Sequence, residues 1–219
     1  MLGGLRASRS GVSVERFSTQ KTAGVLARLA YTCPRPLSRD YLVETFWPDD
    51  DDERGRQNLR QSLTVLRHIL EPPEAPSQSV VVATRSDVRI NADALTTDVA
   101  AFQLSLQTAS TDGEDVEAHL KHSVSLYRGE LLPGFYDDWV ISERRALEEA
   151  YLSALRRLVA LKESASQFDE ALHYVNQWIV TAPDDDGATY AAMRICHAEP
   201  PYVGVKILPR PYRGSSDAI

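Results

Sequence analysis

The stretch from Glu53 to Leu70 constrains the fold of this chain most strongly, because it carries a helical period over about five turns. At about 100° per residue, four leucines fall in one narrow arc. They are Leu59, Leu63, Leu66 and Leu70. Burying them contributes roughly 6 to 12 kcal/mol before entropy, which is enough to fix the rotation of the helix. The polar face is therefore expected to point away from the core in a defined direction.

The polar face of this predicted helix carries side chains that can read a DNA duplex. Arginine can bridge a guanine edge, glutamine can bridge an adenine edge, and arginine and threonine can hold phosphates. The candidate base-reading residues are Arg54, Gln57, Arg60, Gln61 and Thr64. An ordinary amphipathic surface helix is the alternative on this stretch alone, because arginine and glutamine are also good helix formers.

Charge is distributed unevenly over the 219 residues, whose net charge is −7. Residues 1–96 hold 13 Lys and Arg against 12 Asp and Glu, and residues 97–219 hold 11 against 19. The two parts thus carry +1 and −8, so the acidity belongs to the second part. A near-neutral first part can still bind DNA where its positive groups cluster on one face. The composition is that of a globular protein, and the length favours two domains.

Several kinds of site are not expected. Cys33 and Cys196 have no CxxC or Cys/His spacing, which argues against a disulfide framework and against structural zinc. The acidic run from Asp49 to Glu53 lacks the spaced ligands of a calcium loop and is interpreted as a solvated loop with favourable charge at a helix start. Neither a metal nor another cofactor is predicted. No nucleophile with its base, carboxylate pair or phosphate loop is recognisable, so we do not expect an enzyme.

No apolar run approaches 18 residues, and the N-terminus lacks the apolar core of a secretory signal. These features predict a cytoplasmic protein without a membrane partner.

The first part reads as small strands, three helices and a hairpin. Residues 2–17 predict two short strands with a turn at 9–11, and residues 19–31 a helix that ends before Pro34. Ser38 can cap a second, short helix that Pro48 stops. After the helix 53–70, residues 80–84 and 88–90 predict a hairpin. This is the order of a winged-helix domain, whose third helix enters a major groove. Arg85 and Arg89 of the hairpin would contact phosphates or, alternatively, lie in a solvated turn.

The second part reads as helical. Val99, Phe102, Leu104 and Leu106 mark a first helix, residues 116–127 a second and residues 142–163 a long third helix. Residues 164–183 resemble half of a tetratricopeptide repeat. The aromatic cluster of Phe135, Tyr136 and Trp139 is either a packed turn or a partner-contact surface. After Met193 the sequence turns rich in proline and glycine, which predicts an irregular tail over residues 198–219.

Specific strings resemble one family of bacterial regulators. PLSRDYLVETFWPDDDDERGRQNLRQSLTVLRHIL, residues 36–70, is similar to the OmpR-like winged-helix domain of activators related to the Streptomyces antibiotic regulatory proteins. TTDVAAFQ at 96–103 and LYRGELLPGFYDDWV at 126–140 look like the helical bacterial transcriptional activator domain that follows it. The resemblance extends over residues 2–190. It implies a mainly α fold with small β elements, with a winged-helix domain at 1–96 and a tetratricopeptide-like domain at 97–197.

The resemblance implies sequence-specific binding to double-stranded DNA at promoters, with activation through contact with RNA polymerase. A second copy of the chain is a further expected partner. The recognition-helix role falls on the base-reading residues named above. Phosphate contacts are assigned to Ser38, Arg39, Arg56, Arg67, Arg85 and Arg89, with packing as an alternative for Arg56 and Arg67.

Two further interpretations stay open. The chain could be an interaction scaffold whose winged helix no longer binds DNA, which the weak positive charge of the first part favours. The abrupt start inside what would be the first strand, together with the tail at 198–219, also indicates a fragment or a truncated gene model. Relatives often carry an ATPase after this region, but no GxxxxGK[ST] string occurs in the chain.

Overall fold

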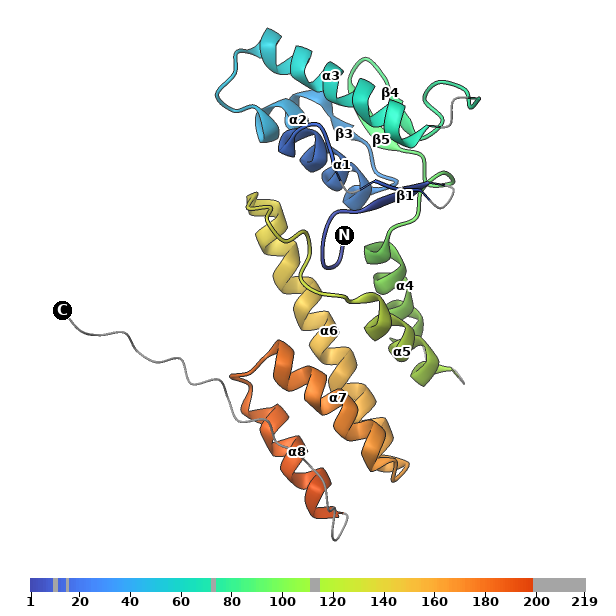
Figure 1. Cartoon of the computed structure of the whole chain (residues 1–219), viewed down its shortest axis with the longest axis vertical. Coiled ribbons are helices and arrows are strands. Elements are labelled where there is room, and N and C mark those ends of the chain that lie inside the picture. The colour runs from blue at the N-terminus through green and yellow to red at the C-terminus, as the bar shows by residue number, and fades with distance from the viewer. Residues whose placement is uncertain (10–11, 15, 72–73, 111–114, 199–219) are drawn as a thin grey trace, which may run out of the picture. The chain divides into compact units, whose positions relative to one another are not determined.

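The computed structural model describes residues 1–9, 12–14, 16–71, 74–110 and 115–198 (Figure 1). The fold is mainly helical with small antiparallel sheets, as the sequence predicts. The chain divides into two compact units, Met1–Leu158 and Val159–Ile219. The predicted tail lies, apart from Ala198, outside the described residues, as do the centre of the first predicted turn and most of the polar break after Ser110.

The first unit begins with two short strands and a helix. β1 (Ala7–Arg9) and β2 (Val12–Val14) pair antiparallel. α1 (Gln20–Thr32) starts at Thr19, whose side chain accepts a hydrogen bond from the Thr22 amide and so satisfies one free N–H of the first turn. Most of α1 is buried, because it lies at the centre of the N-terminal core.

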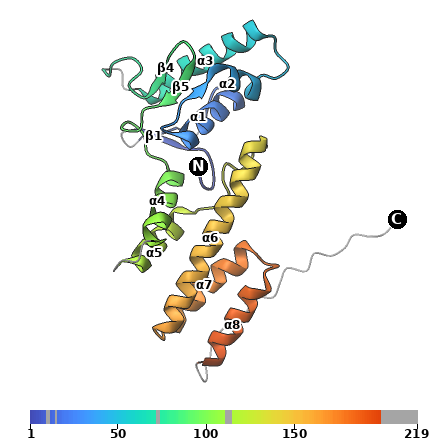
Figure 2. The same cartoon turned by 180° about the vertical axis from the view of Figure 1, so that it is seen from behind.

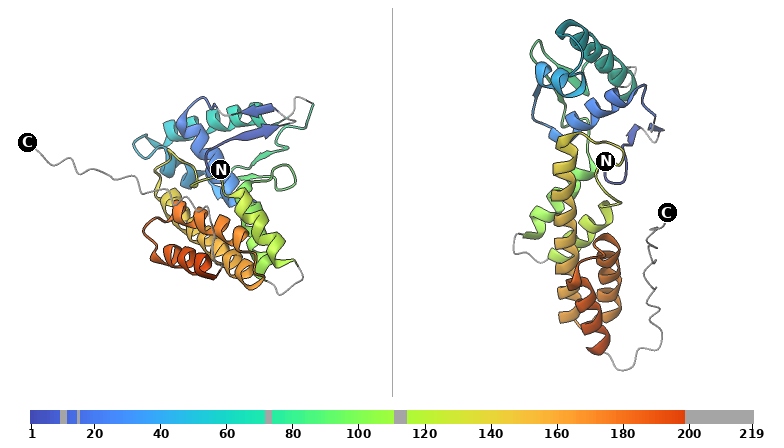
Figure 3. Two further views of the ribbon diagram at one scale, coloured as in Figure 1. Left: turned by 60° about the horizontal axis from the view of Figure 1, so that its bottom comes forward. Right: turned by 90° about the vertical axis from the view of Figure 1, so that its left-hand side faces the viewer.

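The predicted helix from Glu53 to Leu70 is present as α3 (Asp52–Leu70), and its four periodic leucines are buried. α2 (Arg39–Phe46), capped by Ser38, precedes it and packs against it. The two helices come together at Gly55, where a Cβ atom would lie 2.5 Å from Val43 Cγ1. α3 lies at the outer edge of the N-terminal part of the chain, with α1 and α2 on one side of it (Figures 1 and 3).

A three-stranded sheet closes the N-terminal core. β4 (Val81–Ala83) and β5 (Asp87–Ile90) form the predicted hairpin. The sequence did not predict β3 (Leu37–Ser38), which pairs antiparallel with β5 on the edge away from β4. Two residues carry no period, and their partner is about 50 positions away in the chain, so no local pattern could reveal this strand.

Helices follow the sheet. α4 (Asp98–Ser110) and α5 (Val116–Leu126) pack together. Leu104, one of the residues that predict this helix, is 64% exposed. Leu104 lies about 200° around the helix from the buried Phe102, and Ser105 and Ala109 occupy the buried positions instead.

α6 (Asp138–Ser164) starts four residues before the predicted Ser142. The carbonyl of Asp137 accepts hydrogen bonds from the amides of Val140 and Ile141, so the first turn of α6 includes Trp139. The predicted boundary at Ser142 is four residues late, because the sequence pattern groups Trp139 with the preceding aromatic residues.

The second unit contains the end of α6 and a helical hairpin. α7 (Phe168–Thr181) and α8 (Asp186–Ala198) lie side by side (Figure 2). The side chain of Lys162 is 3% exposed, and its Nζ lies 2.9 Å from Glu170 Oε2 and donates to Gln167 Oε1 at 2.7 Å. The described part of α8 extends past Met193, so the helical period lasts longer than the sequence predicts.

Candidate nucleic-acid interface

The five candidate base-reading side chains lie on one exposed face of α3. Arg54, Gln57, Arg60, Gln61 and Thr64 are all exposed. The side chains of Arg54 and Arg60 are 73% and 61% exposed, so both can reach a ligand. The buried leucines on the opposite side hold this face in a fixed direction, as the sequence argument requires.

A groove of about 820 Å³ lies beside this face, between the start of α2, α3 and the turn of the β4–β5 hairpin. Its lining residues are Ser38, Arg39, Asp40, Arg56, Leu59, Arg60, Thr84, Arg85 and Ser86. The charged residues of the groove are thus four arginines and one aspartate. Burial, and after it the neighbouring charges of Arg60 and Arg67, lower the pKa of the Arg39 guanidinium.

Hydrogen bonds hold the hairpin turn against α2. The amide of Arg39 donates to the Ser86 carbonyl at 2.8 Å, and Arg39 Nε donates to the Thr84 carbonyl at 3.0 Å. Thr84 Oγ1 in turn accepts from the amides of Ser86 and Asp87. Arg85 is therefore presented from a turn of defined shape rather than from a loose loop.

The other candidate phosphate contacts have different surroundings. Ser38 Oγ caps α2 by accepting from the Tyr41 amide. Arg67 is half-buried, and its Nε donates to the Val81 carbonyl at 3.2 Å, so this side chain joins α3 to β4. Arg89 is exposed on β5, and 48% of the Arg56 side chain is exposed. Ser38, Arg39, Arg56 and Arg85 come together in the groove, whereas Arg67 and Arg89 do not line it.

Thr84 and Ser86 line the groove on either side of Arg85, and neither is among the residues predicted from the sequence. The available signal was their position at the tip of a predicted hairpin. Their hydroxyl groups are of the type that contacts phosphate oxygens in nucleic-acid complexes.

The aromatic cluster divides into buried and exposed members. Phe135 is buried, and the half-buried Trp139 lies 5.6 Å from the ring of Tyr31 and 4.7 Å from the guanidinium of Arg28. Both side chains therefore lie against other parts of the chain, Trp139 from the first turn of α6. Tyr136 is 79% exposed and is the member that a partner could contact.

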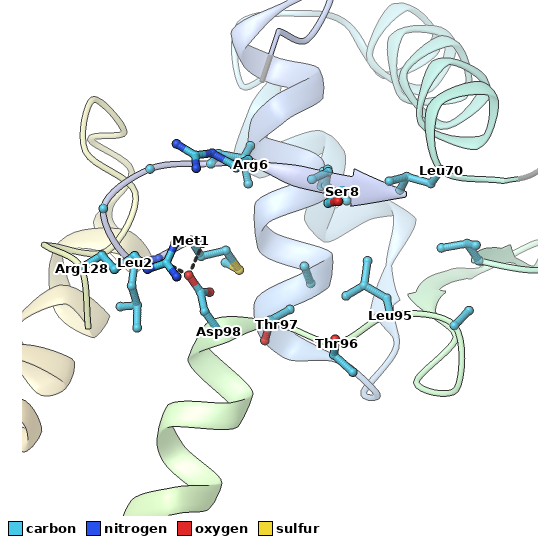
Figure 4. A pocket seen from close by; sticks show the side chains of 18 residues that line it. Met1, Leu2, Arg6, Ser8, Leu70, Leu95, Thr96, Thr97, Asp98 and Arg128 are labelled. Atoms are coloured by element: carbon cyan, nitrogen blue, oxygen red, sulfur yellow. Dashed lines mark hydrogen bonds and ion pairs between the residues drawn. The ribbon is translucent and has the colours of Figure 1, made fainter. Parts of the chain in front are cut away.

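A second cavity, of about 780 Å³, lies between the N-terminal residues, α1 and the segment leading into α4 (Figure 4). Leu26, Ala30 and Leu70 form part of its apolar lining. Asp98 at its edge is engaged, because it accepts from the N-terminal ammonium at 2.7 Å and from the Leu2 amide at 2.8 Å.

Within the described ranges, no three His, Cys, Asp or Glu side chains group together as ligands for a metal ion. In the same part of the chain, no helix has both the length and the apolar character that crossing a membrane requires.

The helices that follow the sheet match a known protein family. Residues 97–199 match the bacterial transcriptional activator domain. This activator segment comprises α4 to α8 and the loops between them. No curated protein sequence matches the chain.

A similar solved structure is that of Mycobacterium tuberculosis EmbR in complex with a low-affinity phosphopeptide, with a TM-score of 0.54 and 19% sequence identity. The match covers 91% of this chain and 64% of the EmbR chain. At this identity the likeness shows a shared fold, and it extends beyond the activator segment to most of the N-terminal part.

Proposed function

We propose that the chain is a sequence-specific DNA-binding transcriptional regulator, an activator, in which α3 is the recognition helix of a winged-helix domain. The observation that carries the proposal is the continuity of two features: the exposed Arg and Gln face of α3 and the arginine-lined groove beside it. Reading bases and neutralising phosphates require such features side by side. The match of the activator segment to a transcriptional activator domain supports the regulatory role.

Different residues provide affinity and sequence selectivity. Arg39, Arg56 and Arg85 contact phosphates on the flanks of the major groove, and the hairpin acts as the wing. Arg60 and the glutamines of α3 contact base edges, where a bidentate arginine favours guanine and a bidentate glutamine favours adenine. The activator segment contacts RNA polymerase or a second copy of the chain.

Binding to duplex DNA over a range of salt concentrations tests the proposal. If about four to six phosphates are neutralised, log K falls with log salt at a slope of roughly −3.6 to −5.4. Selection from a random duplex pool should return a defined sequence whose half-site spacing reports the arrangement of bound copies.

The variant Arg60→Ala/Gln57→Ala is expected to lose roughly ten- to a hundredfold in affinity for the selected duplex and to relax its sequence preference. Arg145→Ala, which removes an exposed arginine of α6, is the matched control and is expected to bind normally. Unchanged affinity and preference in the α3 variant would contradict the assignment of the recognition helix.

A second candidate function is an interaction scaffold without DNA affinity. The observation that favours it is the exposure of large apolar side chains on the α7–α8 hairpin: Val180 is 82% exposed, and Tyr190 and Met193 are each 66% exposed. Exposed apolar side chains on helical repeats suit protein partners. Capture of purified RNA polymerase by the full chain, combined with no duplex binding at low salt, would select this function over the first.

A further inference from the structure

Three solvent-facing arginines of α3 lie beside carboxylates from the acidic residues at the start of this helix and from Asp40 of α2. Two of the three are candidate base-reading residues, and the third lines the groove. The pairs, with the nitrogen to oxygen distances, are Arg54 with Asp50 at 3.7 Å, Arg60 with Glu53 at 3.7 Å, and Arg56 with Asp40 at 3.6 Å and with Asp52 at 3.9 Å.

The nitrogen to oxygen distances of these pairs are longer than those of two ion pairs in the activator segment. Lys121 Nζ lies 2.7 Å from Glu117, and Arg156 Nη1 donates to Glu149 at 2.8 Å. The distances at α3 exceed the usual hydrogen-bond range, so the carboxylates attract the arginines without fixing them. DNA phosphates or base edges can therefore bind these guanidinium groups without first breaking a hydrogen bond to one of these carboxylates.

We propose that Asp40, Asp50, Asp52 and Glu53 are internal counterions that compete with DNA phosphates for the arginines of α3, an inference that rests on the proposed DNA binding. An arginine that already lies beside a carboxylate gains less from a phosphate, because one ion pair replaces another. The carboxylates also repel the phosphates directly.

The competition lowers the electrostatic part of the affinity, which is the part that every duplex shares. A duplex that offers only phosphates then holds the chain weakly at a given protein concentration. A duplex that also bonds Arg60 and the glutamines through its base edges adds the affinity that is missing. The acidic residues thereby lower the affinity for every duplex, so that only a duplex with favourable base contacts is bound at a given protein concentration.

Asp51 is not one of these counterions. Its carboxylate accepts from the Arg54 amide at 2.9 Å and caps α3, so it has a structural task and should be left unchanged in any test. Asp52 and Glu53 lie in the first turn of α3 and also complement the helix dipole. Neutralising them should therefore destabilise the fold slightly while it strengthens DNA binding, and a merely structural role would weaken both.

The test compares two variants of the full chain that each lose two negative charges. Asp52→Asn/Glu53→Gln releases Arg60 from its carboxylate and Arg56 from one of two, and the control Glu117→Gln/Glu149→Gln removes carboxylates from two ion pairs of the activator segment. The probes are a duplex of random sequence and heparin, a sulfated polyanion. The first variant should bind both probes roughly two- to fivefold more tightly for each charge removed.

Salt provides a second readout. The gain should shrink as salt rises toward 1 M, where the screening length falls to about 3 Å, and the slope of log K against log salt should steepen in the α3 variant. Asp40→Asn alone should give a smaller gain of the same sign, because Arg56 keeps Asp52.

The outcomes separate this inference from the proposed function. Equal heparin and DNA affinities in the α3 and control variants would overturn the competition. Tighter heparin binding by the α3 variant, with no duplex binding by any form of the chain, would leave the competition for polyanions standing and reject the DNA-binding function.

Discussion

At the residue scale, Gly55 sets how closely α3 approaches α2. Alanine is a better helix former than glycine by about 1 kcal/mol, yet a Cβ at this position would lie 2.5 Å from Val43 Cγ1. Overpacking a core costs about 1 to 3 kcal/mol, so we expect Gly55→Ala to lower the free energy of unfolding in spite of its helix propensity. Urea denaturation followed by circular dichroism measures the change.

Val43→Ala provides the check on this explanation. If the clash is the cause, Gly55→Ala should cost less in the Val43→Ala background than in the wild type, with a coupling energy of about 0.5 to 3 kcal/mol. Gln61→Ala, at an exposed position of the same helix, is the control for propensity and should change stability little. Additive effects at 43 and 55 would mean that the two side chains do not collide.

At the element scale, the loop between α5 and α6 depends on one arginine. Arg144 Nε donates to the carbonyl of Leu131 at 2.9 Å, and its Nη2 donates to the carbonyls of Leu132 and Phe135 at 3.0 and 3.2 Å. Leu132 is buried and has a φ of 49°, in the left-handed region that a leucine rarely adopts. The planar guanidinium offsets this strain by binding three carbonyls that curve around it.

Arg144→Lys is therefore expected to lower the free energy of unfolding by roughly 2 to 4 kcal/mol, because one ammonium cannot reach the three carbonyls in the same geometry. Arg145→Lys, at the exposed neighbouring position, should leave stability within about 0.5 kcal/mol of the wild type. Thermal and urea denaturation of both variants make the comparison. Equal stability of the two would show that the loop does not need the guanidinium.

Elements with a long period could be predicted from the sequence, whereas elements that depend on distant contacts could not. The leucines of α3 repeat along about three turns and define both the helix and its exposed face. β3 exists only through its pairing with β5, and the hydrogen bonds of Arg144 depend on how a loop folds back. Neither leaves a local pattern in the sequence.

In the candidate site, too, residue types could be predicted from the sequence, whereas contacts between distant residues could not. The residue types of Arg39 and Arg85 predict phosphate contacts, but their meeting in one groove depends on hydrogen bonds that the amide and the side chain of Arg39 donate to the hairpin turn. The acidic run before α3 was interpreted as helix-start chemistry, which describes Asp51. Its neighbours lie beside arginines as far as seven residues away, a relation that depends on side-chain conformations.

At the scale of the whole molecule, positive and negative charges concentrate in different parts of the chain. The net charge of −7 comes from the residues after 96, while the groove and the polar face of α3 concentrate arginines in the N-terminal part. Under the proposed function, the acidic activator segment is expected to repel phosphates, and we expect its partner to be a protein. If DNA binding and contact with this partner are separate, a variant should exist that loses activation and keeps DNA binding.

Tyr136→Ser is the variant that tests this separation. Tyr136 is 79% exposed, whereas its neighbours in the cluster pack internally, so its loss should leave the fold and the DNA affinity unchanged. If Tyr136 is an anchor of the polymerase contact, polymerase binding should weaken by roughly thirtyfold, and transcription in vitro from the selected promoter should fall with it. Leu104→Ser, at another exposed apolar position of the activator segment, is the matched control. Normal transcription by Tyr136→Ser would place the partner surface elsewhere. Val180, Tyr190 and Met193 of the α7–α8 hairpin would be the next positions to change, because they are 82%, 66% and 66% exposed.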